Sequence, residues 1–325
     1  MKRLWPLYLV PNFPRGRWLA AVAIFCLMAA VLFGTGEALT EDGRFDGYIP
    51  LFFCVIVAYI IPVFHFITAH TEKAFDDLGN LLALEEGERE SMRLSIAHKS
   101  WLWIMGIFAF AVCLWLLQSW LLLGADVMVM AYTSTFQQAV LATGPLIVWI
   151  VMTFVINALI DNAALFRRLV KRARVDIYDT RSLTPFGSMA VSSILGVVGA
   201  QASFSIMWLG DTTNPWTTIP GLILTTIALA YLFFLPVWPL HIALRQAKSA
   251  ELAKLQRRIN AITAQDRDDH AQLVPLLAVR REMLSTPEWP VDLSLLARLS
   301  LYLVIVPLTW IGAALIENIV DVFVQ

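Results

Sequence analysis

The chain of 325 residues contains little charge. Asp, Glu, Lys and Arg make up 15% of it, against about a quarter in a typical soluble domain. Hydrophobic residues make up 58%, and the mean hydropathy is +0.69. An ordinary water-soluble fold of this length needs more charged residues to cover its surface. The composition therefore predicts an integral membrane protein. The net charge of −1 gives no reason to expect a nucleic-acid partner.

Cysteine is scarce, and the common catalytic motifs are missing. Cys26, Cys54 and Cys113 all fall in apolar runs and form no CxxC pair, so we expect buried hydrophobic side chains rather than disulfides or a zinc site. The sequence has no GxSxG, HExxH, Walker A or GxGxxG pattern. We therefore expect a protein that is not an enzyme and that holds no metal or cofactor.

Seven apolar runs are present, and each is long enough to cross roughly 30 Å of hydrocarbon as a helix. They lie near residues 17–35, 48–70, 101–124, 137–161, 188–210, 217–243 and 296–324. We therefore predict an all-α integral membrane protein with a single membrane domain of seven transmembrane helices. The basic stretch before the first run is long and interrupted by prolines, which favours a retained span over a cleaved signal peptide.

Lysine and arginine are nearly absent from every second loop. Of the 24 such residues, all but Arg44 lie before the first run or in the segments after the second, fourth and sixth runs and their flanking turns. Basic loops stay on the cytoplasmic side of a membrane. This distribution predicts a cytoplasmic N-terminus and a C-terminus outside, in a multi-pass plasma-membrane protein of a bacterial inner membrane.

The longest segment between runs, residues 244–295, has a helical pattern. Leu252, Leu255, Ile259 and Ile262 follow the 3-4-3 spacing of a coiled-coil seam. The sequence AQDRDDH then indicates a turn, and QLVPLLAVRREML resumes the helical pattern. We predict a helical hairpin that extends the sixth and seventh spans into the cytoplasm.

The last run carries two acids on one face. Glu317 and Asp321 are four residues apart, so a helix places them on the same side. An ionisable group inside a span is costly and usually faces the protein interior or a water-filled cavity. Two interpretations stay open: an anchor at the outer interface, solvated by headgroup water, or a ring of carboxylates at the mouth of a cation pathway in a homo-oligomer.

The fifth run combines small residues with one buried amide. Ser192, Gly196 and Ala200 recur at every fourth position, a pattern that lets another helix approach closely. The amide of Gln201 needs a hydrogen-bond partner that lipid does not offer. We expect this span to pack inside the bundle. A pathway-lining role for Gln201, with Asn157 of the fourth run as a further candidate, is the alternative.

A basic patch follows the fourth run. Its members are Arg167, Arg168, Lys171, Arg172 and Arg174. The patch either fixes the topology while it rests against anionic lipid headgroups, or binds a specific anionic ligand or lipid. No nucleic-acid-binding module accompanies it.

The predicted layout, with seven spans, an inner N-terminus, short outer loops and long helical inner extensions, resembles that of the insect chemoreceptor class of cation channels. The resemblance implies that the last span lines a central pore and that the inner extensions form subunit contacts. It concerns topology alone, because the aromatic-rich stretch ending in Gln-Phe of that class is not found in LYLVIVPLTWIGAALIEN. It therefore transfers no residue roles to this chain.

The sequence thus favours a homo-oligomeric, cation-conducting channel with the seventh span nearest the pore. Two other functions remain open. One is a membrane scaffold or signalling protein that does not conduct and docks a cytosolic partner or anionic lipid. The other is a small-solute transporter.

If Glu317 lies at the mouth of a cation pathway, Glu317→Gln removes a charge that concentrates cations there. We expect the variant to show lower conductance or lower cation selectivity than the wild-type protein in planar bilayers. Unchanged permeation in this variant would count against the channel.

Overall fold

The computed structural model describes most of the chain, and the described part is almost entirely helical. The described residues are 2–34, 47–79, 81–82, 84–173, 180–209, 215–264 and 270–285, with positions 297, 300, 301, 304, 308 and 312. They form nine α-helices: α1 (Gly16–Phe33), α2 (Tyr48–Asp77), α3 (Glu86–Ala97), α4 (Trp101–Leu123), α5 (Ala125–Thr133), α6 (Phe136–Val170), α7 (Thr184–Ser203), α8 (Pro215–Ala264) and α9 (His270–Ser285). The prediction of an all-α protein is confirmed.

Several short elements join these helices. They are the 3-10 helices η1 (Trp5–Tyr8), η2 (Thr180–Leu183) and η3 (Phe204–Leu209), and the two-residue strands β1 (Lys2–Arg3) and β2 (His98–Lys99). Side chains define two of the helix starts, because the Ser100 hydroxyl accepts from Trp103 N–H and the Thr135 hydroxyl accepts from Gln138 N–H. Gly124, with a φ of +81°, separates α4 from α5.

Five of the described helices have the length and composition of membrane spans. They are α1, α2, α4, α6 and the stretch from α7 into η3. The first five predicted runs fall on them. The helix α8 covers the sixth run, 217–243, whereas almost all of the seventh, 296–324, lies outside the described residues. The chain therefore has the helices of a multi-pass membrane protein.

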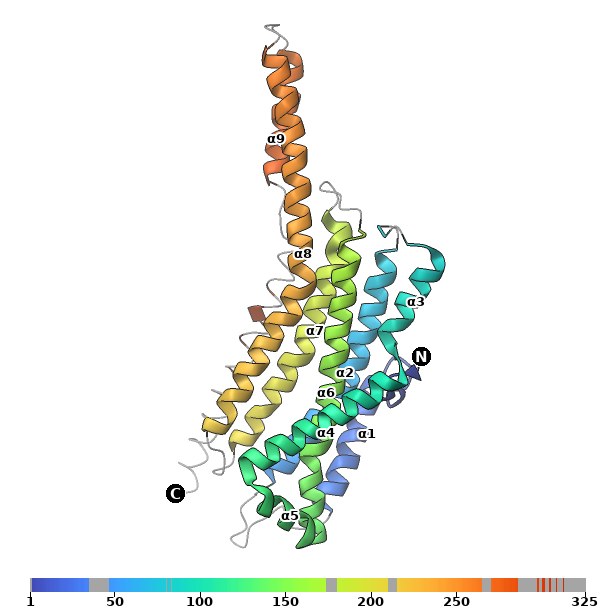
Figure 1. Ribbon diagram of the computed structural model, residues 1–325, viewed down its shortest axis with the longest axis vertical. Helices are drawn as coiled ribbons and strands as arrows, with labels where there is room; N and C mark the ends of the chain where they lie inside the picture. The colour runs from blue at the N-terminus through green and yellow to red at the C-terminus, as the bar shows by residue number, and fades with distance from the viewer. Residues whose placement is uncertain are drawn as a thin grey trace.

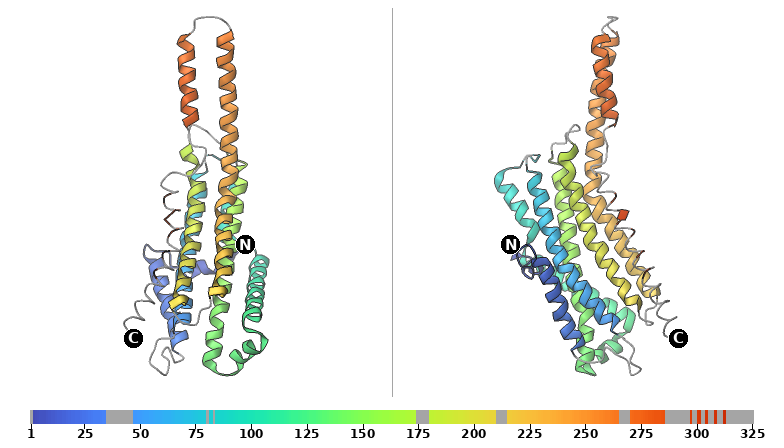
Figure 2. Two further views of the ribbon diagram at one scale, coloured as in Figure 1. Left: turned by 90° about the vertical axis from the view of Figure 1, so that its left-hand side faces the viewer. Right: turned by 180° about the vertical axis from the view of Figure 1, so that it is seen from behind.

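The spans form a bundle in which α2 and α7 are central and α1 and α4 are peripheral (Figures 1 and 2). Within the most apolar stretch of each helix, 67% of α2 and 61% of α7 is buried, against 17% of α1 and 11% of α4. The exposed side chains of α1 and α4 are nevertheless large and hydrophobic, such as Leu27 and Leu102. Such surfaces suit contact with lipid rather than water.

The peripheral position of α1 and α4 corrects the expectation for the cysteines. Cys54 on α2 is buried, but Cys26 on α1 and Cys113 on α4 are exposed. Apolar neighbours in the sequence predict a hydrophobic environment for these residues. They do not predict burial in protein, because lipid supplies the same environment at the periphery of a bundle.

The two central helices approach closely through glycines of α7. The hydroxyl of Tyr59 on α2 donates to the Leu195 carbonyl at 3.0 Å. A Cβ atom added at Gly199 would overlap the Tyr59 hydroxyl, and one at Gly196 would lie 2.6 Å from Ile67 Cδ1. Only a residue without a side chain fits at each of these two positions. The absence of side chains there lets the two backbones approach closely.

The helices α8 and α9 form a hairpin that projects beyond the bundle (Figure 1). The two helices lie side by side in both views of Figure 2. Leu255, Ile259 and Met283 form a small buried cluster between them, with Leu252 and Leu276 packed against it. At the base of the hairpin, Lys248 Nζ donates to the Leu284 carbonyl at 3.2 Å, and this cation also opposes the negative end of the α9 dipole. The turn at AQDRDDH falls largely on residues 265–269, outside the described part.

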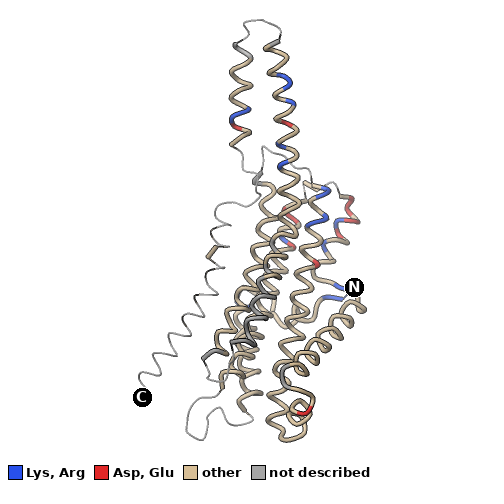
Figure 3. The backbone as a smooth tube through the Cα atoms, turned by 60° about the vertical axis from the view of Figure 1, so that its left-hand side comes forward, with Lys and Arg blue, Asp and Glu red and all other residues tan. Residues whose placement is uncertain are grey.

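The charged residues that the structure describes gather at the end that carries α3 and the hairpin (Figure 3). At the opposite end, α5 contributes Asp126 in its first turn. The long apolar parts of the spans lie between these two ends. The two ends of the bundle therefore differ sharply in charge, as the distribution of lysine and arginine in the sequence predicts.

Because Gly199 faces the partly buried Tyr59 side chain, we expect Gly199→Leu to force α7 away from α2. Overpacking of this kind costs about 1–3 kcal/mol, which would lower the thermal midpoint of the purified protein in detergent. Gly106→Leu on the outer face of α4 is the matched control, since no atom lies within 4 Å of a Cβ built there. Equal midpoints for the two variants would contradict the close packing of α2 and α7.

Candidate functional site

The basic patch predicted after the fourth run lies at the charged end of α6. Arg167 and Arg168 occupy the last turn of α6 and are exposed, as is Lys171 just beyond it. Cations at this position oppose the negative end of the helix dipole. Arg172 differs from them, because its guanidinium pairs with Glu88 of α3. Arg174 lies outside the described residues. The described part of the patch therefore has four exposed cations, and one of them, Arg172, is in an ion pair.

Ion pairs hold α3 across the ends of α2 and α6. Arg93 Nε lies 3.0 Å from Asp76 Oδ1 at the end of α2, and Arg172 reaches Glu88 from the end of α6. Both pairs are largely exposed, so each contributes little stability by itself. Under them, Phe75, Ile96 and Phe166 belong to one buried cluster. This apolar contact, with the pairs around it, fixes α3 against the bundle.

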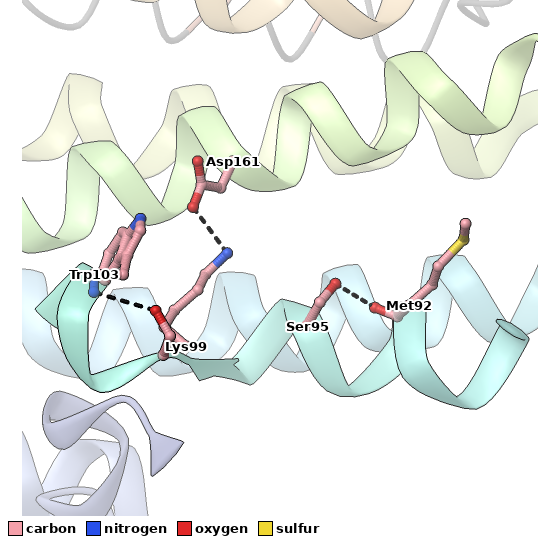
Figure 4. A network of polar contacts seen from close by, with 6 residues as sticks. Met92, Ser95, Lys99, Trp103 and Asp161 are labelled. Atoms are coloured by element: carbon pink, nitrogen blue, oxygen red, sulfur yellow. Dashed lines mark hydrogen bonds and ion pairs between the residues drawn. The ribbon is translucent and has the colours of Figure 1, made fainter. Parts of the chain in front are cut away.

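A third ion pair is better shielded and ties the start of α4 to α6 (Figure 4). Lys99 Nζ lies 2.9 Å from Asp161 Oδ2, and the Lys99 side chain is only 13% exposed. The same ammonium group lies 5.6 Å from the centre of the Trp103 ring, where the ring face attracts a cation. Lys99 therefore joins three elements: β2, α4 and α6.

The polar residues predicted to line a pathway lie apart from the described cavity. Asn157 Nδ2 donates to the Thr153 carbonyl one turn earlier at 2.8 Å, and Gln201 is buried near the end of α7. A narrow void between α2, α6 and α7 is lined only by apolar residues and glycine, and neither Asn157 nor Gln201 borders it. The other two candidates, Glu317 and Asp321, lie outside the described residues.

The predicted packing residues of α7 lie within the bundle. Ser192 and Ala200 are buried, and the Ser192 hydroxyl donates to the Met189 carbonyl at 2.9 Å. Gly196 and Ala200 border the narrow void, on its α7 side. The small residues of α7 thus lie where α2 and α6 converge on it.

The hairpin carries an apolar stripe that no described residue covers. On α9, Leu276 and Met283 face α8, whereas Val274, Leu277 and Leu284 are exposed. The exposed three are separated by three and seven residues, so they share one side of the helix. The sequence of α9 contains this stripe at heptad-like spacing. A search for one coiled-coil seam finds the residues that pack α8 on α9 instead, so the exposed stripe is not identified from the sequence.

The two helices of the hairpin carry a net positive charge, and two of the cations, Arg280 and Arg281, lie on α9 beside the stripe. Residues 244–264 and 270–285 hold seven lysines and arginines: Arg245, Lys248, Lys254, Arg257, Arg258, Arg280 and Arg281. The same residues hold two acids, Glu251 and Glu282, which leaves a formal charge of +5 on the two helices. The connecting sequence QDRDD adds one basic and three acidic residues, so the hairpin as a whole stays at +3.

No known protein helps to identify the site, because no family model, curated protein or solved structure matches this chain. Among the residues that the structure describes, no three His, Cys, Asp or Glu side chains gather closely enough to hold a metal ion. The exposed apolar stripe of α9, with Arg280 and Arg281 beside it, is the candidate site.

The shielded pair of Lys99 and Asp161 gives a testable expectation for stability. Lys99→Gln or Asp161→Asn alone leaves a partly buried charge without its partner, at a cost of about 1–3 kcal/mol. We expect each single variant to lower the thermal midpoint and the double variant to recover part of the loss. Glu251→Gln, which breaks the exposed pair with Lys254, is the control and should change little. Additive losses in the double variant would show that the pair does not couple α4 to α6.

Proposed function

We propose that the protein is a membrane scaffold whose α8–α9 hairpin docks a cytosolic partner through an acidic, amphipathic helix of that partner. One observation carries this function: the hairpin projects beyond the bundle and presents an apolar stripe, uncovered by any described residue, with two arginines beside it. Val274, Leu277 and Leu284 would form the apolar contact, and Arg280 and Arg281 beside them would meet acidic side chains.

The orientation of the protein is part of the proposal. The hairpin lies at the end of the bundle where lysine and arginine gather, and such ends face the cytoplasm. The N-terminus would then be inside, the seventh span would cross back, and the C-terminus would be outside. A bacterial inner membrane is the proposed location. In this orientation the stripe is accessible to soluble proteins of the cytoplasm.

The length of α8 suits it to present a surface away from the membrane. A helix of 50 residues is about 75 Å long, and the hydrocarbon core takes about 30 Å of that. About 45 Å therefore remains beyond the hydrocarbon. The tip of the hairpin lies at this distance, and Leu284, opposite Lys248 at the base, lies about 24 Å nearer the membrane. The part of the stripe formed by Val274 and Leu277 clears the lipid headgroups, so a folded partner can reach it without contacting the bilayer.

Charge favours a partner of another kind over a second copy of the hairpin. Two hairpins docked through their stripes would bring two surfaces of like charge together, which costs energy. An acidic helix would instead be steered toward the surface and held there. A third helix packed on the stripe would also complete a coiled-coil geometry that α8 and α9 already begin.

The cation-channel and transporter hypotheses stay predictions. The acids that would mark a channel mouth, Glu317 and Asp321, lie outside the described residues. The described void between α2, α6 and α7 offers an apolar lining and little room, and a transport site for a polar solute needs convergent polar groups. The homo-oligomeric state likewise stays a prediction.

Site-specific photocrosslinking in cells tests the docking surface. A photoreactive amino acid at Leu277 should give a covalent adduct with one cytosolic protein, and the same group at the inward-facing Leu276 should not. We expect the adduct at Leu277 to disappear when Arg280→Glu and Arg281→Glu are added, because the charge would then repel an acidic partner.

Three results would overturn the proposal. Equal adducts at Leu277 and Leu276 would show that the reaction does not depend on the stripe. An adduct that survives the charge reversal would show that the partner is not acidic. An adduct of twice the chain mass would assign the stripe to self-association instead.

A further inference from the structure

The N-terminal segment is fixed to the bundle by a small sheet. Strand β1 pairs antiparallel with β2, so that Lys2 lies opposite Lys99 and Arg3 opposite His98. The next residue, Leu4, donates its N–H to the Ala97 carbonyl at 2.9 Å and is itself buried. We call β1, β2 and the first turn of α1 the N-terminal clasp. The clasp joins the start of α1 to the start of α4.

The clasp concentrates positive charge. All four residues of the sheet are lysine, arginine or histidine, and Arg17 in the first turn of α1 adds a further charge. Lys2 and Lys99 are direct partners in the sheet, and Arg17 lies over the ring of Phe66 on α2. Like charges that lie opposite each other in a sheet repel, and a bound anion would relieve that repulsion.

Three of these cations have no carboxylate partner among the described residues. Lys99 is paired with Asp161, but Lys2, Arg3 and Arg17 lie over aromatic rings instead. Lys2 Nζ is 4.7 Å from the Trp101 ring centre, Arg3 Cζ is 5.7 Å from that of Tyr8, and Arg17 Cζ is 5.2 Å from that of Phe66. The rings orient the cations without neutralising them.

Two buried nitrogen atoms at the clasp lack hydrogen-bond partners within the described structure. They are Nδ1 of His98, in the sheet itself, and Nδ1 of His65 on α2, next to Phe66, over whose ring Arg17 lies. Buried polar atoms in folded proteins nearly always have a partner. Together with Arg3 and Arg17, these atoms indicate a bound group that carries both negative charge and hydrogen-bonding oxygens.

The surroundings of the clasp favour a lipid as the source of that group. Trp18 and Trp101, at the starts of α1 and α4, are exposed, and Trp18 is 77% exposed. Tryptophan in such positions marks the level of the membrane interface. Beyond this level, Val22 on α1 and Leu102 on α4 are exposed and apolar, so they can contact acyl chains.

We infer that the N-terminal clasp binds the headgroup phosphate of an anionic phospholipid, with the acyl chains against the exposed faces of α1 and α4. Arg3 and Arg17 neutralise the phosphate, and His98, the sheet partner of Arg3, bonds to the headgroup oxygens. Lys2, on the opposite face of β1 beside Lys99, lies outside this site. The site is separate from the exposed cations at the end of α6, and it does not depend on the function proposed for the hairpin.

The test measures lipid retention by the full-length protein. The protein is purified from nanodiscs that contain equal amounts of phosphatidylglycerol and phosphatidylcholine, and native mass spectrometry counts the bound lipids. The clasp variant is Arg3→Gln with Arg17→Gln. The control is Arg257→Gln with Arg258→Gln, which removes the same charge from the hairpin. Each lost cation near a membrane surface weakens the binding of anionic lipid roughly fivefold.

We expect wild type and control to retain phosphatidylglycerol preferentially and the clasp variant to lose this preference by about 25-fold. Equal preference in the clasp variant and the control would overturn the inference, as would equal retention of both lipids by the wild type. Displacement of the bound phosphatidylglycerol by inorganic phosphate would assign the site to a free anion instead.

A second measurement covers the case in which the clasp variant fails to insert. Photoreactive phosphatidylglycerol is added to the wild-type protein, and the labelled peptides are sequenced after digestion. Labels within residues 2–22 and 98–105 are expected. Labels that concentrate at residues 167–171 instead would overturn the inference, because the exposed cations of α6 would then be the lipid site.

Discussion

The close contact between α2 and α7 is the constraint on which the rest of the bundle depends. In lipid, apolar side chains gain little by leaving the solvent, so helices must be held by close packing and by hydrogen bonds between them. The α2–α7 contact supplies both, because Gly199 and Gly196 admit Tyr59 and Ile67, and Tyr59 donates to the Leu195 carbonyl. With these two helices fixed, α6 packs on α2, and α8 packs on α6 and α7.

The exposed fraction of the described helices rises from the α2–α7 contact toward the periphery of the bundle. The central helices bury their surfaces in protein, and α1 and α4 are held at the periphery with large apolar side chains outward. The peripheral helices pack along their neighbours, α1 on α2 and α4 on α6. The clasp and the ion pair of Lys99 with Asp161 add polar contacts at the starts of α1 and α4, and Trp149 of α6 donates to Gln118 nearer the other end of α4.

The sequence predicts the long helices well, because a span must be apolar over about 20 residues and no other structure satisfies its backbone in lipid. The spacing of Leu252, Leu255, Ile259 and Ile262 also predicts a hairpin seam, and the first three of these residues lie in the cluster between α8 and α9. The sequence does not predict the clasp, because two short polar segments almost a hundred residues apart carry no periodic signal. The ion pair of Lys99 with Asp161 is not predicted either, for the same reason. The exposed Cys26 and Cys113 show that an apolar sequence does not tell whether a side chain contacts lipid or protein. Glu317 and Asp321 lie outside the described residues, so the interpretation of these two acids rests on the sequence alone.

The continuity of α8 has a mechanical consequence. One helix runs from the bundle to the far end of the hairpin, so a tilt within the membrane moves the tip as a lever would. A tilt of about 10° over the projecting 45 Å or so displaces the end by about 8 Å. Pro236 and Pro239 lie in α8 where it still packs on the bundle, and each removes a backbone hydrogen bond that would resist bending. The bundle and the hairpin are therefore one mechanical unit, and α8 bends most easily at Pro236 and Pro239, where it still packs on the bundle.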